Sequence, residues 1–426
     1  MLKNGLSYRG VMFFSLLSHL SLLVIVFVKG KYDNIMDPLI LSGAVFALDI
    51  AWFIALHIFE QNTYTFDILL ETILGMSIIL QSSFGGVKLN IKHYIFSVAA
   101  LVLCEVSHRF VRDYHFIESH KYIFYGLIGV LILSILLLTG SRSMWIDLGF
   151  ITIQPSEFIK PLFVLVFATS ILKQREQKKI LFLNVVPDNW ILFGLTGVVV
   201  LLQWWCRDLG SLPTFMAVAS CGLLMRICYP KAKLSKKLII SICIGGAVIV
   251  LAALKLAPSY VQARLHVDIW ADPNGDGWQQ CQALIATAEG GWFGKGPGQG
   301  FLYKVPAADT DIVFSTISEE WGLLASVMMV LMILLLIITA VINKPRSYFH
   351  TTLSLGAAAV FVAQMALNIF GSCNLIPFTG VTLPFVSNGG SSMLACGVIA
   401  GFLKSGQAMI YYVPKRPSAS PERRKA

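Results

Sequence analysis

Long apolar stretches follow one another along this chain, and they limit what it can fold into. An α-helix rises 1.5 Å per residue, so about 20 apolar residues are needed to cross about 30 Å of hydrocarbon. Runs close to this length are found at residues 10–28, 37–58, 67–84, 93–110, 122–139, 157–173, 190–205, 211–228, 237–256, 321–343, 350–371 and 391–412. The sequence therefore predicts an all-α polytopic membrane protein with about 12 transmembrane helices.

The composition supports this class and excludes others. The mean hydropathy is +0.73, 56% of the residues are hydrophobic and only 13% are charged, values that a water-soluble globule could hardly tolerate. The formal net charge of +10 would suit nucleic acid, but the basic residues stand in short clusters between apolar runs, as membrane topology requires. No nucleic-acid partner is therefore expected. The cysteines show no CxxC spacing, which argues against a zinc site or a disulfide framework.

Basic residues gather in alternate connections, and this sets the expected orientation. By the positive-inside rule, the connections rich in Lys and Arg are cytoplasmic. Both termini are then cytoplasmic, and the long connection at 257–320, between the ninth and tenth expected helices, is extracytoplasmic. The first apolar run has no cleavage site of small residues, so it is expected to remain as a helix. The clusters behind this orientation are Arg109 to Lys121, Lys173 to Lys179, Arg226 to Lys237, Lys344 to Arg346 and the tail from Lys415 to Lys425.

One extracytoplasmic stretch is polar and rich in glycine, unlike the runs on either side of it. It reads DPNGDGWQQCQALIATAEGGWFGKGPGQG over residues 272–300, and a loop of this size in so apolar a chain is usually functional. Asp272, Asn274 and Asp276 match the opening of an EF-hand, but Ala283 stands where the bidentate Glu is required, so an EF-hand is excluded. A weaker site for a divalent cation, magnesium or manganese, stays open, and so does a plain pair of turns at Asp-Pro and Asn-Gly.

Further segments on the same side carry more polar residues than connections need. Glu157 lies three residues before Lys160 at the start of a helix, so the two either form an ion pair or combine a dipole-favoured acid with a snorkelling lysine. Arg207 and Asp208 end an apolar run, where charges are by default functional, although such neighbours can also neutralise each other. Residues 374–392 hold no charge but many Pro, Gly, Ser and Thr, which suits either a re-entrant backbone or an ordinary loop.

The expected location restricts the chemistry. The outer side of a membrane offers neither ATP nor nucleotide sugars, so an enzyme there needs an already activated substrate, and lipid-linked phosphates are the usual one. The chain agrees with this, because it has no P-loop and no GxGxxG motif after a strand.

These segments resemble the SEDS family of cell-wall polymerases, the group of RodA, FtsW and SpoVE. The resemblance covers roughly residues 120–412, and it is specific because separate motifs occur in one order. The matching segments are DLGFITIQPSEFIKP, RDLGSLPTF, the polar stretch at 272–300, DTDIVFSTISEEWGLLA and LIPFTGVTLPFVSNGGSSML.

The resemblance implies a peptidoglycan glycosyltransferase that polymerises lipid II on the outer face of the cytoplasmic membrane. A sugar hydroxyl of the acceptor would attack the anomeric carbon of a lipid-diphosphate-linked glycan, with inversion and release of undecaprenyl diphosphate. The family's essential acid falls on Asp272, as general base or as a metal ligand. A class B penicillin-binding protein is the implied partner, and elongation, division and sporulation are all compatible roles.

The resemblance and the residue chemistry together define the predicted site. Asp272 is the expected catalytic residue, and Asp272 with Asp276 is the candidate site for a metal ion. Residues 1–60 are expected to add about two helices to a core of about ten at 61–412, followed by a basic disordered tail at 413–426. The residues expected to bind substrate or support the site are Glu157, Lys160, Arg142, Asp208, Gln279, Gln282, Lys295, Asp311, Glu319, Glu320, Ser387 and Ser391.

Two other functions stay open. A lipid II flippase would need charged groups along a path through the bilayer, whereas the acids concentrate in the outer loops, with Asp49 and Glu105 as the main exceptions. A non-catalytic scaffold for division or for the spore wall would have no need to retain Asp272 and the matching segments.

Overall fold

A computed structural model gives the fold of the chain. It describes residues 8–59, 64–138, 145–147, 152–171, 178–180, 183–185, 187–206, 208, 210–228, 269–270, 275, 277–342 and 347–406, and all that follows refers to these residues.

Helices make up most of the described residues. All the expected spans coincide with a helix except 237–256, which lies outside the described residues, so the total of twelve remains a prediction. Among the described residues, four helices are long and apolar enough by themselves to cross a membrane, namely α1, α2, α14 and α15. The helices are α1 (Tyr8–Lys29), α2 (Met36–Ile58), α3 (Tyr64–Gln81), α4 (Ile91–Phe110), α5 (Tyr114–Ser119), α6 (Lys121–Leu138), α7 (Pro155–Ile171), α8 (Pro187–Trp205), α9 (Leu212–Cys228), α12 (Trp278–Gly290), η1 (Leu302–Lys304), α13 (Val313–Trp321), α14 (Leu323–Ile342), α15 (Tyr348–Ser372) and α16 (Gly390–Ser405).

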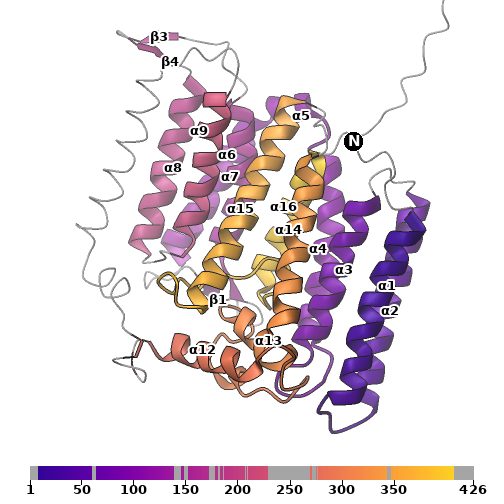
Figure 1. Cartoon of the computed structure of the whole chain (residues 1–426). Helices are drawn as coiled ribbons and strands as arrows, with labels where there is room; N and C mark the ends of the chain where they lie inside the picture. Colours follow the sequence, from indigo (N-terminus) through magenta and orange to yellow (C-terminus); the bar gives the residue numbers. More distant parts are fainter. Residues whose placement is uncertain are drawn as a thin grey trace, which may run out of the picture.

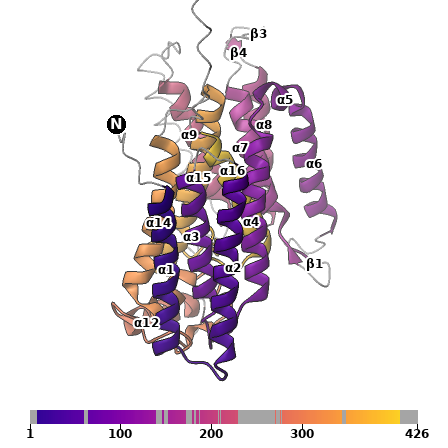
Figure 2. The same cartoon turned by 90° about the vertical axis from the view of Figure 1, so that its right-hand side faces the viewer.

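The long helices run side by side as a bundle with two distinct ends (Figure 1). One end carries α5 and the short antiparallel pair β3 (Lys178–Ile180) and β4 (Leu183–Val185); we refer to it as the α5 end. The other carries α12 and α13, and we refer to it as the α12 end. A second short pair, β1 (Ile146–Asp147) with β2 (Thr152–Ile153), lies toward the α12 end (Figure 2).

The polar, glycine-rich stretch forms much of the α12 end. Helix α12 has only 13 residues, too few to span a bilayer, and it lies across the end of the bundle (Figure 1). The glycines after it allow close backbone contacts. Gly294 has a φ of +74°, and its missing side chain leaves room for the main chain at Glu320 and Gly322.

Helices α4 and α16 pack against each other through small residues. Gly397 and Gly401 form a GxxxG spacing on α16, which lets two helix backbones approach closely within a membrane. A Cβ on Gly397 would lie 2.6 Å from the carbonyl oxygen of Ala100 and 2.7 Å from its Cα, both on α4. The Ser107 hydroxyl donates across the same interface to the carbonyl of Val398, at 3.0 Å.

Gly397→Val is therefore expected to destabilise the fold. The added side chain has no room, so α16 must move away from α4, at a cost of about 1–3 kcal/mol or more. Gly126→Val on α6 is the matched control, because a Cβ there meets no atom within 4 Å. Thermal unfolding in detergent should show a lower melting temperature for Gly397→Val alone, and equal melting temperatures would contradict the packing described above.

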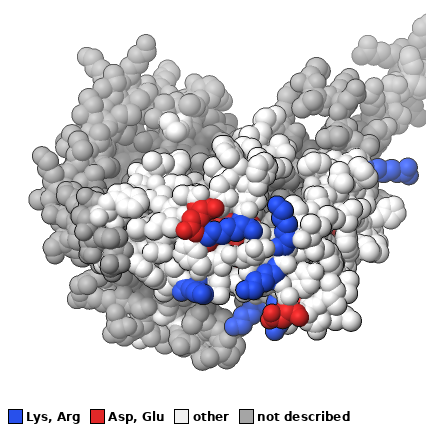
Figure 3. All heavy atoms as spheres, turned by 60° about the horizontal axis from the view of Figure 1, so that its bottom comes forward, with Lys and Arg blue, Asp and Glu red and all other residues white. Residues whose placement is uncertain are grey.

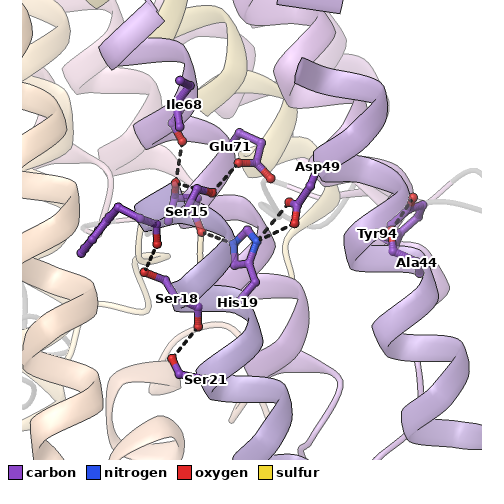
Figure 4. Close-up of polar contacts among 11 residues, drawn as sticks. Ser15, Ser18, His19, Ser21, Ala44, Asp49, Ile68, Glu71 and Tyr94 are labelled. Carbon is purple, nitrogen blue, oxygen red and sulfur yellow. Dashed lines mark hydrogen bonds and ion pairs between the residues drawn. The ribbon is translucent and has the colours of Figure 1, made fainter. Parts of the chain in front are cut away.

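Helices α1 and α2 dock on α3 through buried polar groups (Figure 4). The Nδ1 atom of His19 lies 3.0 Å from Oδ1 of Asp49, and Nε2 donates to the carbonyl of Thr72 at 3.1 Å. The Ser15 hydroxyl donates to Oε2 of Glu71 at 3.0 Å, and all of these side chains are buried. Gly75 on α3 makes room for the imidazole ring, since a Cβ there would overlap it. The hairpin of α1 and α2 is thus fixed to α3 by specific contacts as well as by apolar packing.

The expectation that Asp49 and Glu105 are the main acids inside the apolar runs is incomplete. Asp67 and Glu71 on α3 are fully buried as well. The Lys404 ammonium lies 2.7 Å from Oδ1 of Asp67 and also pairs with Glu105, so these two acids share one buried cation. Buried acids of this kind need a paired base or a proton, because hydrocarbon does not solvate charge.

Candidate active site

A cavity of about 450 Å³ opens among the elements that meet at the α12 end. The start of α7, the turn between α8 and α9, the turn before α13 and the loop before α16 all contribute to its wall. It brings together five of the residues predicted from the sequence, namely Glu157, Lys160, Asp208, Asp311 and Ser391. Its other polar lining residues are Gln154, Ser211, Thr310, Thr379, Thr382 and Ser392.

Glu157 and Lys160 form the ion pair that was one of the two interpretations of their spacing. Pro155 begins α7, where its fixed φ favours the first helical turn and its missing N–H is not needed. Nζ of Lys160 lies 2.6 Å from Oε1 of Glu157, and the two side chains are only 2% and 6% exposed. Oε2 of Glu157 has no hydrogen-bond partner among the described residues. The cavity wall therefore holds a buried cation with a carboxylate beside it that can still accept a hydrogen bond.

Asp208 organises the turn that leads into α9. Its Oδ1 accepts from the backbone N–H groups of Gly210 and Ser211, at 3.2 and 3.4 Å, and Oδ2 accepts from the Ser211 hydroxyl at 3.0 Å. The Gln154 amide also approaches Oδ2, at 3.5 Å. Position 210 must be glycine, because a Cβ there would overlap the carbonyl oxygen of Thr379. These hydrogen bonds hold the Asp208 carboxylate in place at the cavity edge.

Asp311 is the third carboxylate of the cavity. Burial raises the pKa of Asp311 to about 6, a hydrogen bond with Thr310 opposes this shift, and the charges of Asp309 and Asp208 add to it. Gly380, with a φ of +66°, passes close to the carboxylate. The concentration of negative charge around Lys160 suits a site that handles protons or hydroxyl groups.

The raised pKa of Asp311 predicts a pH-dependent gain in stability for Asp311→Asn. The ordinary pKa of an aspartate side chain is 3.8, so between this pH and about pH 6 the folded protein holds a proton at Asp311 that the unfolded chain has lost. The contribution of Asp311 to the free energy of unfolding therefore falls as the pH rises through that window. An Asn side chain carries no charge to bury. Relative to the wild type, the free energy of unfolding of Asp311→Asn should therefore be about 1–2 kcal/mol more favourable to the folded state near pH 7 than near pH 4. Denaturation of both proteins at the two pH values checks this, and a difference between them that does not change with pH would contradict it.

The loop before α16 supplies hydroxyl groups and a helix N-terminus. Ser391 and Ser392 lie in the first turn of α16 and line the cavity, and the Ser392 hydroxyl is 2.6 Å from that of Thr382. The first N–H groups of a helix have no partner within the helix and favour anions. Ser387 lies outside the cavity lining, since its hydroxyl donates to the carbonyl of Thr310 at 2.6 Å and accepts from the N–H of Leu383 at 2.8 Å.

Glu319 and Glu320 are buried beneath the glycine-rich loop and do not line the cavity. Glu319 accepts from the N–H groups of Phe301 and Leu302, at 3.0 and 2.9 Å, and pairs with Lys295 at 2.9 Å. Glu320 accepts from the N–H of Gly298 at 2.9 Å and from the Ser83 hydroxyl at 2.8 Å. Burial raises the pKa of Glu320 to about 7, although these hydrogen bonds oppose the shift. Both acids hold the loop in shape.

The remaining predicted residues fall into two groups. Lys295, Gln279 and Gln282 are described but lie outside the cavity lining. Lys295 forms ion pairs with Glu289 and Glu319, and Gln279 donates to the carbonyl of Pro306 at 3.2 Å. Gln282 is half-buried on α12. Asp272, Asp276, Arg142 and Arg207 lie outside the described residues.

Sequence reasoning missed several polar residues of the cavity. Gln154 stands directly before Pro155, and Ser211 follows Asp208 closely, so their proximity to predicted residues was the available signal. Thr379, Thr382 and Ser392 belong to the uncharged segment at 374–392, whose composition alone did not distinguish a cavity wall from an ordinary loop.

The sequence of this chain is similar to a known protein family over most of its length. The family model of FtsW, RodA and SpoVE, described as cell cycle proteins, matches residues 62–409. A probable peptidoglycan glycosyltransferase FtsW of Alcanivorax borkumensis is 33% identical over 277 residues, which are 62% of this chain and 68% of that protein. The corresponding protein of Aliivibrio salmonicida is 29% identical over 329 residues, which are 73% of this chain and 78% of that protein.

Solved structures share the fold. One is a chain from a peptidoglycan synthase complex, described in a study of the structural coordination of polymerization and crosslinking, with a TM-score of 0.60 and 23% identity over 80% of this chain and 96% of that chain. Another is the rod shape determining protein RodA of Thermus thermophilus, with a TM-score of 0.53 and 20% identity over 80% of this chain and 95% of that chain. The helical membrane fold predicted from the sequence is confirmed by these likenesses.

Proposed function

Because the chain belongs to the FtsW, RodA and SpoVE family, we propose that it is a peptidoglycan glycosyltransferase that polymerises lipid II. The proposed reaction takes place at the α12 end of the bundle, on the outer face of the cytoplasmic membrane. Undecaprenyl diphosphate is the leaving group, and the lipid tails of the substrates remain in the bilayer. The relatives are named as probable peptidoglycan glycosyltransferases, which supports the activity, and the description of the family as cell cycle proteins supports a role in cell-wall synthesis.

The observation that carries this proposal is the cavity with a buried cation beside three carboxylates. A glycosyl transfer from a lipid diphosphate needs stabilisation of the departing negative charge and a base for the attacking hydroxyl, and it needs no covalent nucleophile. Lys160 supplies positive charge from a buried position, where electrostatic interactions are stronger than in bulk water. The hydroxyl groups of Ser391 and Ser392 and the N-terminus of α16 are further groups that favour a diphosphate.

Asp272 is the proposed general base. It would accept the proton of the acceptor's sugar hydroxyl as this oxygen attacks the anomeric carbon, the bond from that carbon to the diphosphate breaks, and the configuration inverts. Glu157 keeps Lys160 in place, and Asp208 with Gln154 forms another part of the cavity wall.

A divalent cation, magnesium or manganese, stays part of the proposal only through Asp272 and Asp276. Within the described residues, the carboxylates of the cavity do not form a group of convergent ligands. The described residues whose possible ligand atoms do converge are His19, Asp49 and Glu71. They lie on α1, α2 and α3 and do not line the cavity. The Asp272 carboxylate would serve either as base or as ligand, and metal removal from the purified protein distinguishes the two roles.

A class B penicillin-binding protein is the proposed partner. A likeness to a chain of a peptidoglycan synthase complex that couples polymerization to crosslinking supports this choice. The partner would supply the transpeptidase activity, since the described residues include no large domain outside the bundle.

The experiment that tests the function uses purified lipid II and the purified protein, with and without a class B penicillin-binding protein. Glycan polymer in either condition is the expected result. A flippase would instead move lipid II across liposome membranes and make no polymer. Such a result, or neither activity despite correct folding, would overturn the proposal.

A further inference from the structure

Unpaired lysines gather at the α12 end of the molecule. Figure 3 shows this end as a face on which basic side chains outnumber acidic ones. Across the described part of the chain, no carboxylate lies within ion-pair distance of these side chains, all of which are exposed. We define the lysine surface as Lys29, Lys31, Lys88, Lys92 and Lys304.

The loops that carry these lysines are held together by backbone contacts. The N–H of Lys31 donates to the carbonyl of Pro297 at 2.8 Å, and the N–H of Val87 donates to the carbonyl of Lys31 at 2.9 Å. The Gln299 amide donates to the carbonyl of Lys29 at 2.6 Å. The turn between α1 and α2, which precedes the residues matched by the family model, therefore forms one surface with the glycine-rich loop.

A second cavity, of about 430 Å³, opens on the same end and includes Lys304 in its wall. Tyr303 packs its ring against Gly85, where a Cβ would lie 2.7 Å away. The amide of Asn388 donates to Oδ2 of Asp309 at 3.0 Å and fixes that carboxylate. An aromatic ring beside amide and carboxylate groups is suited to a sugar, because the ring packs on C–H groups while the polar atoms bind hydroxyls.

One short segment separates the two cavities. Ala307, whose φ is +57°, lines both of them. Asp309 then lies in the wall of the second cavity, and Asp311 lies in the wall of the first. A ligand in the second cavity would therefore lie next to the proposed reaction site.

The lysine surface lies on the proposed outer side, where a membrane protein is expected to carry few basic residues. Lys and Arg are normally favoured on the cytoplasmic side, so exposed lysines on the outer side call for another reason. An anionic ligand is such a reason. Phosphate headgroups of lipids would bind the lysines, but Asp309 in the cavity would repel a phosphate and would accept hydrogen bonds from sugar hydroxyls.

We propose that the lysine surface and the second cavity bind the growing glycan strand next to the reaction site. The cavity holds a sugar unit, and the lysines hold the carboxylates of the peptide stems. The proposal rests on the proposed function for the identity of the ligand. It also gives the end of α1 and the turn after it a role, since Lys29 and Lys31 lie there.

Binding of soluble fragments tests this without catalysis. The full-length protein in nanodiscs of neutral lipid is titrated with a peptidoglycan tetrasaccharide bearing its stem peptides, and with neutral chitotetraose. The wild type should prefer the anionic fragment, and its affinity should fall with salt. The Lys29→Glu/Lys31→Glu variant should bind this fragment about tenfold or more weakly, because it reverses two exposed charges. Tyr303→Ala should weaken binding of both probes.

Arg9→Glu is the matched control, since Arg9 is exposed at the opposite end of α1. It should bind like the wild type. No binding of the anionic fragment by the wild type, or equal binding by the wild type and Lys29→Glu/Lys31→Glu, would overturn the proposal. Retention of phosphatidylglycerol is measured separately in nanodiscs that contain this lipid. A loss in Lys29→Glu/Lys31→Glu that is confined to phosphatidylglycerol would also overturn the proposal, because it would assign the surface to lipid. Binding as expected in a protein that makes no polymer would contradict the proposed function and leave this surface standing.

Discussion

Asp272→Ala is expected to make no detectable glycan polymer from lipid II while the protein remains folded. Loss of a general base lowers a rate by about 10²–10⁴-fold. A carboxylate in a polar loop contributes little to the packing of helices, so the melting temperature should stay close to that of the wild type. Polymer formation and thermal unfolding, measured on the same preparation, check both parts.

Asp276→Ala is the matched comparison, because it removes the same group four residues further along the same loop. If Asp272 acts only as a base, Asp276→Ala keeps most of its activity and chelators have little effect. If the two acids hold a divalent cation, both variants lose activity and added magnesium or manganese changes the wild-type rate. Wild-type activity in Asp272→Ala would remove the proposed catalytic residue altogether.

Lys160→Met is expected to lose both polymerisation and stability. The substitution leaves Glu157 buried without its partner, and breaking one side of a buried ion pair costs about 3–5 kcal/mol. It also removes the cation that would stabilise the diphosphate leaving group. The measurements are thermal unfolding in detergent and the rate of polymer formation from lipid II.

The double variant Glu157→Gln/Lys160→Met separates these two effects. With no charge left in the pair, stability should return toward that of the wild type, since neutral groups of similar size replace a buried ion pair at little cost. Activity should remain absent, because the cation is still missing. A double variant that recovers activity together with stability would mean that Lys160 has a structural role only.

The helical framework was predictable because membrane helices follow from length and apolarity alone. Runs such as 37–58 and 321–343 carry that signal along most of their length, and α2 and α14 lie where it indicates. Contacts between helices were not predictable. His19, Asp49 and Glu71 lie on three different helices, and nothing in their local sequence says that they meet.

The candidate site was predictable where chemistry depends on neighbours in the chain. Glu157 and Lys160 are three residues apart on one helix, so their pairing follows from helical geometry. Glu319 and Glu320 look like substrate-binding acids in the sequence, yet the structure directs them to backbone N–H groups of the glycine-rich loop. That outcome depends on how a distant loop folds over α13, which no local pattern encodes.

The cavity itself is a product of tertiary structure. Asp208 and Asp311 come from turns about a hundred residues apart in the chain, and Gln154 faces Asp208 only because α7 and the turn before α9 meet. Residue type identified Asp208 and Asp311 as candidates, whereas neutral residues such as Thr382 gave no comparable signal.

Polymer formation from purified lipid II tests most directly whether this protein is a polymerase that depends on Asp272. The wild type and Asp272→Ala are measured side by side with a class B penicillin-binding protein whose own catalytic serine has been replaced. Glycan strands are expected from the wild type and none from Asp272→Ala. Strands from both proteins, or from neither while both remain folded, would contradict it.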